Sequence, residues 1–169
     1  MSKIDSMDIR ACTLADLDAV QAIYAHHVRT GFGTFEEEPP AVEDMRQRLE
    51  TLAAHGSPFL VAVLDGELAG YAYAGPFRPR AAYRYTCESS VYVAAGLQRR
   101  GVGRGLMLRL IDECQRRGKR QMLAVIGDSA NAASIGLHAA LGFESVGVFK
   151  NVGCKFGRWV DVVLMQRGL

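Results

Sequence analysis

The sequence predicts an α/β (α+β) fold in which helices cover both faces of a sheet of mixed direction. Short apolar runs of strand length alternate with amphipathic segments of helical spacing, in the order β-α-α-β-β-β-α-β-α-β-β. The length of 169 residues, 49% of them hydrophobic and 22% charged, predicts one globular domain over residues 1–169 and excludes an intrinsically disordered chain.

The first part of the chain is predicted to form a short strand and two helices. The strand covers residues 8–12, and Thr13 followed by Asp16 resembles a capping box at the start of a helix. Apolar residues then recur at helical spacing as far as Gly31. A polar segment that ends in two prolines separates this helix from a second one at residues 42–54.

The remainder is predicted to form a hairpin, further strands and two more helices. Asp65-Gly66 is a typical hairpin turn between two apolar runs. Gly118 and Gly142 end the two helical patterns, as glycines at helix C-termini commonly do. The predicted strands are residues 59–64, 68–74, 85–93, 122–126, 143–148 and 160–165, and the helices are residues 102–117 and 131–141.

Composition and patterning exclude several classes of protein. No apolar run approaches the roughly 18 residues that a membrane helix needs, and residues 1–10 lack the apolar core of a secretory signal, so we expect a cytoplasmic protein. The four cysteines form no Cys-x-x-Cys pair, so we expect no metal. The net charge of +2 argues against a strongly basic nucleic-acid-binding protein, although basic residues are frequent in residues 99–120.

The most informative segment is a glycine-bearing turn between a strand and a long helix. It reads Gln98-Arg99-Arg100-Gly101-Val102-Gly103-Arg104. A helix start presents unpaired N–H groups and the positive end of the helix dipole, and glycines let a phosphate approach the backbone. With its three arginines, the turn is therefore a candidate pyrophosphate site. It lacks the Gly-Lys-Ser/Thr of a P-loop, and on spacing alone its glycines can equally serve close packing.

The first six of these residues resemble the acyl-CoA-binding motif Gln/Arg-x-x-Gly-x-Gly/Ala of the GNAT superfamily of N-acetyltransferases. Further blocks, spread over residues 8–167, resemble the phosphinothricin and methionine sulfoximine acetyltransferases within it. These blocks are Phe35-Glu36-Glu37, Gly75-Pro76-Phe77-Arg78-Pro79-Arg80, Tyr85-Thr86-Cys87-Glu88-Ser89-Ser90-Val91-Tyr92-Val93, Asn131-Ala132-Ala133-Ser134-Ile135-Gly136-Leu137-His138 and Gly153-Cys154-Lys155-Phe156-Gly157-Arg158-Trp159.

The resemblance implies a GNAT-like, mostly antiparallel central sheet of about seven strands, acetyl-CoA as co-substrate and a small amino-acid-like amine as acceptor. The pantetheine arm would pair with one strand as an added strand does. The implied coenzyme-binding residues are Val91, Tyr92, Val93, Arg99, Arg100, Gly101, Val102, Gly103, Arg104 and Asn131. The implied acceptor-binding residues are Arg78, Pro79, Arg80, Glu88, Ser89 and Ser90.

Acetyl transfer to an amine requires a neutral nitrogen, so a base or a water relay should assist. Glu88 is the candidate base, and its alternative is a solvated glutamate paired with Arg84 or Arg78. A free backbone N–H near Val91 can stabilise the oxyanion. His138 stands where many superfamily members have a tyrosine. It can donate to the departing sulfur or carry a proton, or it can be an ordinary histidine at a helix edge.

Other residues have less specific assignments. Arg78 and Arg80 can bind a carboxylate or phosphinate bidentately, or form a solvated basic loop. His26 and His27 lack a third ligand and are predicted to be structural or to line the pocket. Cys87 is next to Glu88, but no cysteine has a recognisable nucleophile setting, which favours direct attack in a ternary complex.

Several alternatives stay open at this point. In the resembling enzymes the neighbourhood of Lys155, Arg158 and Trp159 lies near the subunit interface, so the resemblance implies a homodimer. The acceptor can instead be a protein N-terminus, a polyamine or an aminoglycoside. A non-catalytic acyl-CoA-binding protein is a further possibility. A nucleic-acid-binding module would rest only on the basic stretch, which lacks interleaved aromatic residues, so we expect neither nucleic acid nor a membrane as partner.

Overall fold

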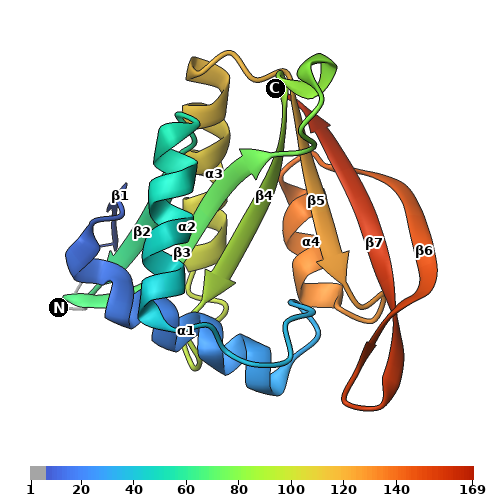
Figure 1. The fold of residues 1–169 in the computed structure, drawn as a ribbon, viewed down its shortest axis with the longest axis horizontal. Helices are drawn as coiled ribbons and strands as arrows, with labels where there is room; N and C mark the ends of the chain where they lie inside the picture. The colour runs from blue at the N-terminus through green and yellow to red at the C-terminus, as the bar shows by residue number, and fades with distance from the viewer. Residues whose placement is uncertain (1–6) are drawn as a thin grey trace, which may run out of the picture.

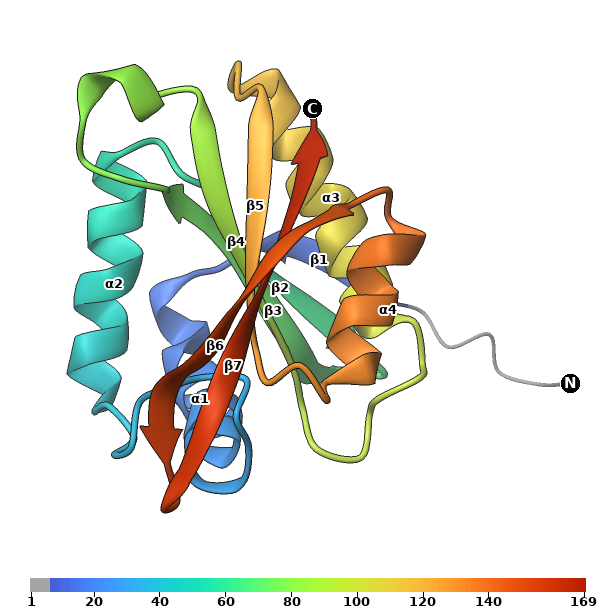
Figure 2. The same ribbon diagram turned by 90° about the vertical axis from the view of Figure 1, so that its right-hand side faces the viewer.

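A seven-stranded sheet of order β1-β2-β3-β4-β5-β7-β6 separates two layers of helices (Figures 1 and 2). The computed structural model describes residues 7–169. Helices α1 and α2 lie on one face of the sheet, and α3 and α4 lie on the other (Figure 2). All neighbouring strands are antiparallel except β4 and β5, which are parallel. The predicted fold class and element order are confirmed.

The bounds of the elements are close to those predicted. The helices are α1 (Leu17–Thr30), α2 (Val42–Ala54), α3 (Val102–Arg116) and α4 (Ala132–Ala140). The strands are β1 (Met7–Ala11), β2 (Phe59–Leu64), β3 (Glu67–Pro76), β4 (Thr86–Val93), β5 (Gln121–Gly127), β6 (Glu144–Lys155) and β7 (Arg158–Gly168). Within residues 7–169, no helix combines the length and apolarity needed to cross a bilayer. The predicted lack of a secretory signal concerns residues 1–10, of which residues 1–6 lie outside the described residues. The assignment of residues 1–169 to one domain stays a prediction.

Two predicted boundaries were wrong. Asp16 forms the predicted capping contact, accepting a hydrogen bond from the Thr13 backbone N–H at 2.8 Å, but the first turn is a short 3-10 helix, so α1 begins at Leu17. Strand β6 continues to Lys155, well beyond the predicted end at residue 148. Residues 149–155 do not alternate between apolar and polar, because β6 is an edge strand with mostly exposed side chains and two register shifts against β7.

Each helical layer buries its own apolar core against the sheet. On the α3 face, Leu106, Met107 and Leu110 are 0% exposed. On the α1 and α2 face, Val20 and Met45 are also 0% exposed. Fully burying one such side chain contributes about 1.5–3 kcal/mol, so the two cores fix the helices rigidly on opposite sides of the sheet.

The central strands β4 and β5 pair over only half of their length. The parallel pairing runs from Thr86 with Gln121 to Ser89 with Ala124 and stops there. Beyond it the strands spread apart, which Figure 1 shows toward their arrowheads. The first turn of α3 follows β4 closely along the chain, and α4 follows β5. The separated ends of β4 and β5 therefore open the sheet beside two helix N-termini.

Candidate active site

A cleft of about 870 Å³ lies between the separated ends of β4 and β5. Most of the residues that were predicted to bind coenzyme or acceptor or to act in catalysis meet in its lining. These are Ser89, Ser90, Val91, Tyr92, Val93, Arg99, Gly101, Val102, Gly103, Arg104, Asn131 and His138. His27 also lines the cleft, in agreement with one of its two predicted roles. The local strand-turn-helix arrangement thus brings together residues of one continuous segment, and α4 completes the cleft.

Other predicted residues do not line the cleft. The loop residues Arg78, Pro79 and Arg80 are exposed and lie outside it, as do Glu88 and Arg100. The Arg100 guanidinium lies 3.3 Å from the Asp65 carboxylate in the β2–β3 turn, whereas Arg99 and Arg104 border the cleft. Gln98, the first residue of the acyl-CoA-binding motif, also lines the cleft, together with several residues that had no individual role in the prediction, namely Gly33, Leu97, Ala124, Val125, Ile126, Gly127, Ala132, Ala133, Ser134 and Leu137.

The turn into α3 has the geometry of an anion-binding site. Gly101 has φ +82°, which glycine adopts readily, and Arg99 has φ +64°. Successive N–H groups in such a turn can converge on an anion, and the first N–H groups of α3 have no acceptor in a preceding helical turn. The guanidinium groups of Arg99 and Arg104 add positive charge at the same end of the cleft.

The cleft reaches both faces of the sheet. Along β4, Cys87, Val91 and Val93 pack in the core on the α3 face, whereas Tyr92 packs with Tyr71 on the α1 face. Because side chains alternate along a strand, Glu88 and Ser90 share the face of Tyr92. Gly103 lines the cleft from the α3 side, and His27 and Gly33 line it from the α1 side. Two molecules can therefore meet in it from opposite faces.

Glu88 is half-buried in β4, opposite Gly75 of β3 and Leu123 of β5. Burial raises the pKa of its carboxyl. Within residues 7–169 no ion pair links Glu88 to Arg78 or Arg84. The Arg78 guanidinium instead stacks on Phe77, 5.0 Å from the ring centroid. A carboxyl with a raised pKa on the same face as Tyr92, two residues from cleft-lining Ser90, is suited to accept a proton.

His138 is 3% exposed in α4 and borders the cleft. Its Nδ1 lies 2.8 Å from the Ser134 carbonyl oxygen. Because that oxygen only accepts, Nδ1 carries the hydrogen. Burial lowers the pKa of His138, so the ring is neutral near pH 7 and Nε2 has a lone pair. The geometry thus favours Nε2 as a proton acceptor over the predicted alternative of a donor to sulfur.

Asn131 and Cys87 have well-defined structural contacts. Asn131 caps α4, with Oδ1 accepting from the Ser134 N–H at 3.2 Å and Nδ2 donating to the Gly127 carbonyl at 3.4 Å. It therefore fixes α4 against β5 while it lines the cleft.

Cys87 is 1% exposed, on the face of β4 opposite Glu88. In the described part of the chain, no three potential metal ligands gather.

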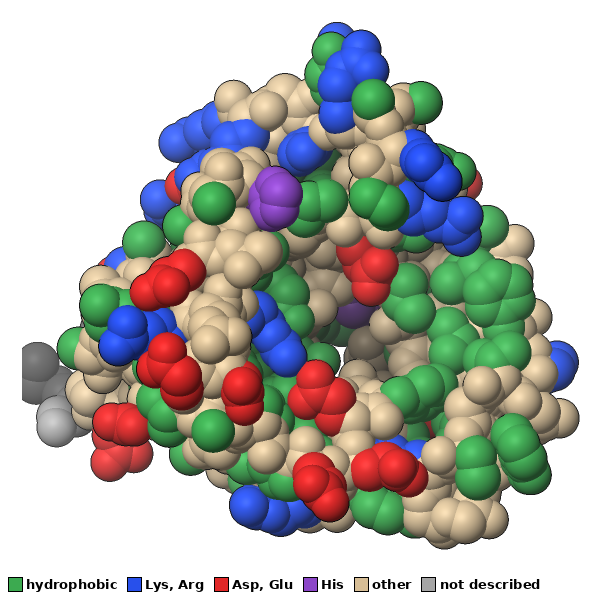
Figure 3. Space-filling view, viewed as in Figure 1, with side chains coloured by type: hydrophobic (Ala, Val, Ile, Leu, Met, Phe, Trp, Pro, Cys, Tyr) green, Lys and Arg blue, Asp and Glu red, His purple; other side chains and the backbone are tan. Residues whose placement is uncertain are grey.

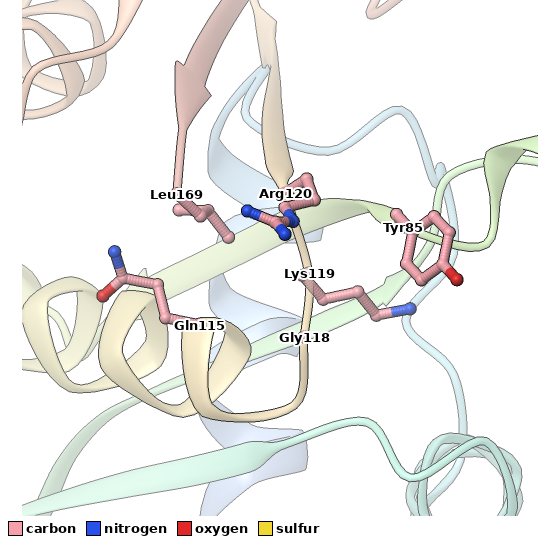
Figure 4. A pocket seen from close by; sticks show the side chains of 6 residues that line it. All are labelled: Tyr85, Gln115, Gly118, Lys119, Arg120 and Leu169. Carbon is pink, nitrogen blue, oxygen red and sulfur yellow. The ribbon is translucent and has the colours of Figure 1, made fainter.

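A second hollow, of about 630 Å³, shares no residue with the cleft. It lies where α3 ends and β5 begins, and Figure 4 shows Lys119 extending toward Tyr85. The Lys119 ammonium donates to the Arg84 carbonyl at 2.7 Å. This hollow collects basic residues from the end of the stretch 99–120, but it is remote from the turn at Gly101. Its lining residues are Tyr85, Gln115, Gly118, Lys119, Arg120 and Leu169.

Comparison with known proteins agrees with this geometry. A family model described as acetyltransferase (GNAT) domain matches residues 9–164. The chain is 56% identical over 164 residues to a phosphinothricin N-acetyltransferase of Alcaligenes faecalis, covering 94% of this chain and 83% of the relative. It is 41% identical over 165 residues to an L-methionine sulfoximine/L-methionine sulfone acetyltransferase of Pseudomonas aeruginosa, covering 97% and 95%. A crystal structure of a GNAT superfamily phosphinothricin acetyltransferase from Sinorhizobium meliloti, in complex with acetyl-CoA, is 42% identical with a TM-score of 0.93, over 96% of this chain and 88% of that chain.

Proposed function

This chain belongs to the GNAT family of acetyltransferases, and we propose that it acetylates the α-amino group of a small amino-acid-like compound, with acetyl-CoA as donor. Methionine sulfoximine, methionine sulfone and phosphinothricin are the proposed acceptor type, by analogy with the named relatives. The cleft that opens on both faces of the sheet is the observation that carries the proposal. The cysteines are free thiols, which favours the cytoplasm as the place of action.

The α3 face of the cleft supports the proposed position of the coenzyme. The diphosphate would lie at the N-terminus of α3, held by backbone N–H groups around Gly101 and Gly103 and by the Arg99 and Arg104 guanidinium groups. The pantetheine arm would then follow the edge of β4 at Val91–Val93, where pairing with β5 has ended. This placement directs the thioester through the sheet toward the face that carries Glu88.

The reaction is a direct transfer between two bound molecules. The amine nitrogen attacks the thioester carbonyl carbon, the C–N bond forms, and collapse of the tetrahedral intermediate breaks the C–S bond. The proton that the nitrogen loses passes to Glu88, directly or through water, and the departing thiolate takes up one proton from solvent, so that coenzyme A leaves as the free thiol. A backbone N–H near Val91 would stabilise the oxyanion, a contribution of about 10²–10³-fold in comparable enzymes. The buried position of Cys87 supports attack without an acyl-cysteine intermediate.

The acceptor is proposed to enter from the α1 face. Figure 3 shows a hollow near the centre of this face, with acidic side chains along its border. Acidic groups favour an acceptor that carries an amine, and the exposed Arg78 and Arg80 are available for its carboxylate or phosphinate. An acidic border also suits a polyamine, so polyamines belong among the amines to be tested.

A panel of amines tests the proposed acceptor type. With acetyl-CoA, release of free thiol should be at least tenfold faster, as kcat/KM, for methionine sulfoximine, methionine sulfone or phosphinothricin than for polyamines, aminoglycosides or peptide N-termini. Preference for one of the latter would contradict the acceptor assignment. Calorimetric binding of acetyl-CoA without thiol release in the presence of any amine would indicate a non-catalytic acyl-CoA-binding protein.

A homodimer is also part of the proposal. The edge strand β6, its turn to β7 and the start of β7 expose several large apolar side chains, and soluble monomers rarely leave such a patch uncovered. These side chains are Val146, Val148, Phe149, Val152, Phe156 and Trp159. In β6 alone, Phe149 is 54% exposed and Val152 is 55% exposed. A second copy of the chain is the proposed cover for this surface.

Light scattering coupled to gel filtration tests the homodimer. The wild-type protein should have about twice the chain mass of 18.4 kDa at micromolar concentration. Phe149→Lys should shift the protein to the monomer, because burying an unpaired charge in an apolar interface is costly. Leu108→Lys is the matched control, since Leu108 is 45% exposed on α3, away from β6. A monomeric wild type, or equal effects of the two variants, would contradict the proposed interface.

A further inference from the structure

A buried lysine anchors the segment 31–36, which follows α1 and passes below the ends of β4 and β5 in Figure 1. Lys155, at the end of β6, is 2% exposed. Its ammonium donates to the Gly31 carbonyl at 2.8 Å and to the Thr34 carbonyl at 2.7 Å. These two residues flank Gly33, which lines the cleft on its α1 side. The two hydrogen bonds therefore fix the backbone before and after Gly33, which forms part of the cleft wall.

Two glycines let the same segment lie directly on the sheet. A Cβ atom at Gly127 of β5 would come within 1.9 Å of the Phe32 carbonyl oxygen. A Cβ atom at Gly153 of β6 would come within 2.3 Å of the Phe35 ring. A side chain at Gly127 would require the backbone of segment 31–36 to move, and one at Gly153 would require the Phe35 ring to move. The sheet thus contacts the segment at the Phe32 backbone and at the Phe35 ring, in addition to the contacts of Lys155.

The segment is coupled in turn to residues deeper in the cleft. The Thr34 hydroxyl lies 2.7 Å from the Tyr24 hydroxyl. Tyr24 packs edge-on against Tyr92, with ring centroids 5.1 Å apart, and Tyr92 lines the cleft. A displacement of Thr34 would therefore disturb Tyr92 as well as Gly33. Both lie on the face where the acceptor is proposed to enter.

The chemistry of Lys155 indicates why a charged group occupies this position. Desolvation lowers the pKa of Lys155, and the carboxylates of Glu37 and Glu36 act in the opposite direction, although within residues 7–169 none lies at ion-pair distance from its ammonium. An apolar side chain would avoid this desolvation, but it would leave two carbonyl groups unpaired. Hydrogen bonds from a charged donor are about twice as strong as those between neutral groups. The ammonium is thus suited to fixing a loop that has little regular structure of its own.

We propose that Lys155 is a positioning residue for the acceptor side of the cleft. By holding the carbonyls on either side of Gly33, it fixes the wall that the acceptor meets, without touching the reacting atoms. This inference rests on the proposed function, because it takes the α1 face as the acceptor's route. Under this proposal, binding of the acceptor depends on Lys155 and binding of acetyl-CoA does not, because the turn that would hold the coenzyme lies at the other side of the cleft.

The test is Lys155→Met, with Lys150→Met as matched control. Lys150 lies on the same strand with an exposed side chain and pairs with Asp161 at the surface. Lys155→Met should raise the KM for the acceptor about tenfold, the effect of losing one or two such hydrogen bonds, with less than a twofold change in the Kd of acetyl-CoA. Hydrogen exchange of residues 31–36 should become faster. Lys150→Met should change none of these quantities.

A purely structural role would give a different pattern. In that case Lys155→Met would lower the melting temperature and the fraction of active protein, while the acceptor KM of the remaining enzyme stayed at the wild-type value. That result, or an equal loss of acceptor and coenzyme affinity, would overturn the inference. If Lys155→Met does not fold, Gly153→Ala pushes the Phe35 ring of the same segment away from β6 without removing a charge, and the same separation of acceptor KM from coenzyme Kd is expected.

Failure of this inference can be distinguished from failure of the proposed function. If wild-type protein binds acetyl-CoA but acetylates no amine, the proposed function is wrong. Hydrogen exchange and coenzyme affinity still test the anchoring by Lys155 in that case. Faster exchange confined to residues 31–36, with unchanged coenzyme affinity, would support the anchoring, whereas unchanged exchange would overturn it.

Discussion

Glu88→Gln is expected to lower kcat by about 10²–10⁴-fold, the range associated with loss of a general base. Glutamine has nearly the same shape as glutamate but cannot take a proton from the amine or from a relay water. Glu88 lies on the acceptor face of β4, outside the cleft lining that would contact the coenzyme. The Kd of acetyl-CoA should therefore change less than twofold, measured by calorimetry beside steady-state kinetics.

The pH dependence provides an independent check of Glu88. Burial raises the pKa of its carboxyl, so the wild-type rate should fall with decreasing pH at a higher pH than an ordinary glutamate would give. In Glu88→Gln this acidic limb should disappear, leaving only the titration of the acceptor amine. A raised pKa also means that the ionised carboxylate destabilises the folded state above the pKa of the unfolded chain. Glu88→Gln should accordingly fold at least as stably as wild type at pH 7.

Glu67→Gln is the control for this substitution. Glu67 is exposed at the start of β3 and lies outside the cleft, so its exchange should leave kcat and the pH profile unchanged. An unchanged rate for Glu88→Gln at every pH would remove Glu88 from the role of base. Equal losses in both variants would mean that the substitution acts through the fold.

Gly103→Glu is expected to weaken acetyl-CoA binding by at least 100-fold. Gly103 lies in the first turn of α3 and lines the cleft, and a Cβ atom there would meet Leu137 and Val93 at ordinary contact distances of 3.4 and 3.5 Å. The backbone can thus accept a side chain, and the carboxylate would occupy the space proposed for the diphosphate. Two like charges in one site repel each other strongly, whereas a carboxylate near a helix N-terminus does not destabilise the helix.

Gly136→Glu provides the matched control for the coenzyme site. Gly136 lies on α4 with no atom within 4 Å of an added Cβ, and it does not line the cleft. Calorimetry with acetyl-CoA should give the wild-type Kd for this variant. If Gly103→Glu also bound acetyl-CoA with wild-type affinity, the diphosphate would have to lie away from the first turn of α3.

The coenzyme turn could be predicted from sequence because its features are local. A strand, a glycine with positive φ and a helix start follow one another within residues 91–104, so spacing alone places their backbone groups together. The bounds of α2, Val42–Ala54, were predicted for the same reason. The prolines before the helix, the apolar residues at helical spacing within it and the glycine after it all lie in one short stretch of sequence.

The proposed acceptor side could not be predicted in this way because it is built from long-range contacts. Gly33 carries no functional group, and its position depends on Lys155, more than 120 residues away along the chain, through hydrogen bonds to its neighbours. Gly127 lies just beyond the predicted strand of residues 122–126, and no sequence pattern marks it, although the Phe32 carbonyl requires a glycine there. Which ring nitrogen of His138 carries the hydrogen is decided by the Ser134 carbonyl of the same helix, and the spacing of residues in the sequence does not reveal this contact.

A crystal structure of the protein with acetyl-CoA tests the position of the coenzyme most directly. We predict diphosphate oxygens within hydrogen-bond distance of backbone N–H groups in residues 101–104, and the thioester between β4 and β5 on the side of Glu88. A diphosphate bound instead in the basic hollow at Lys119 and Arg120 (Figure 4), with the space between β4 and β5 empty, would contradict the account.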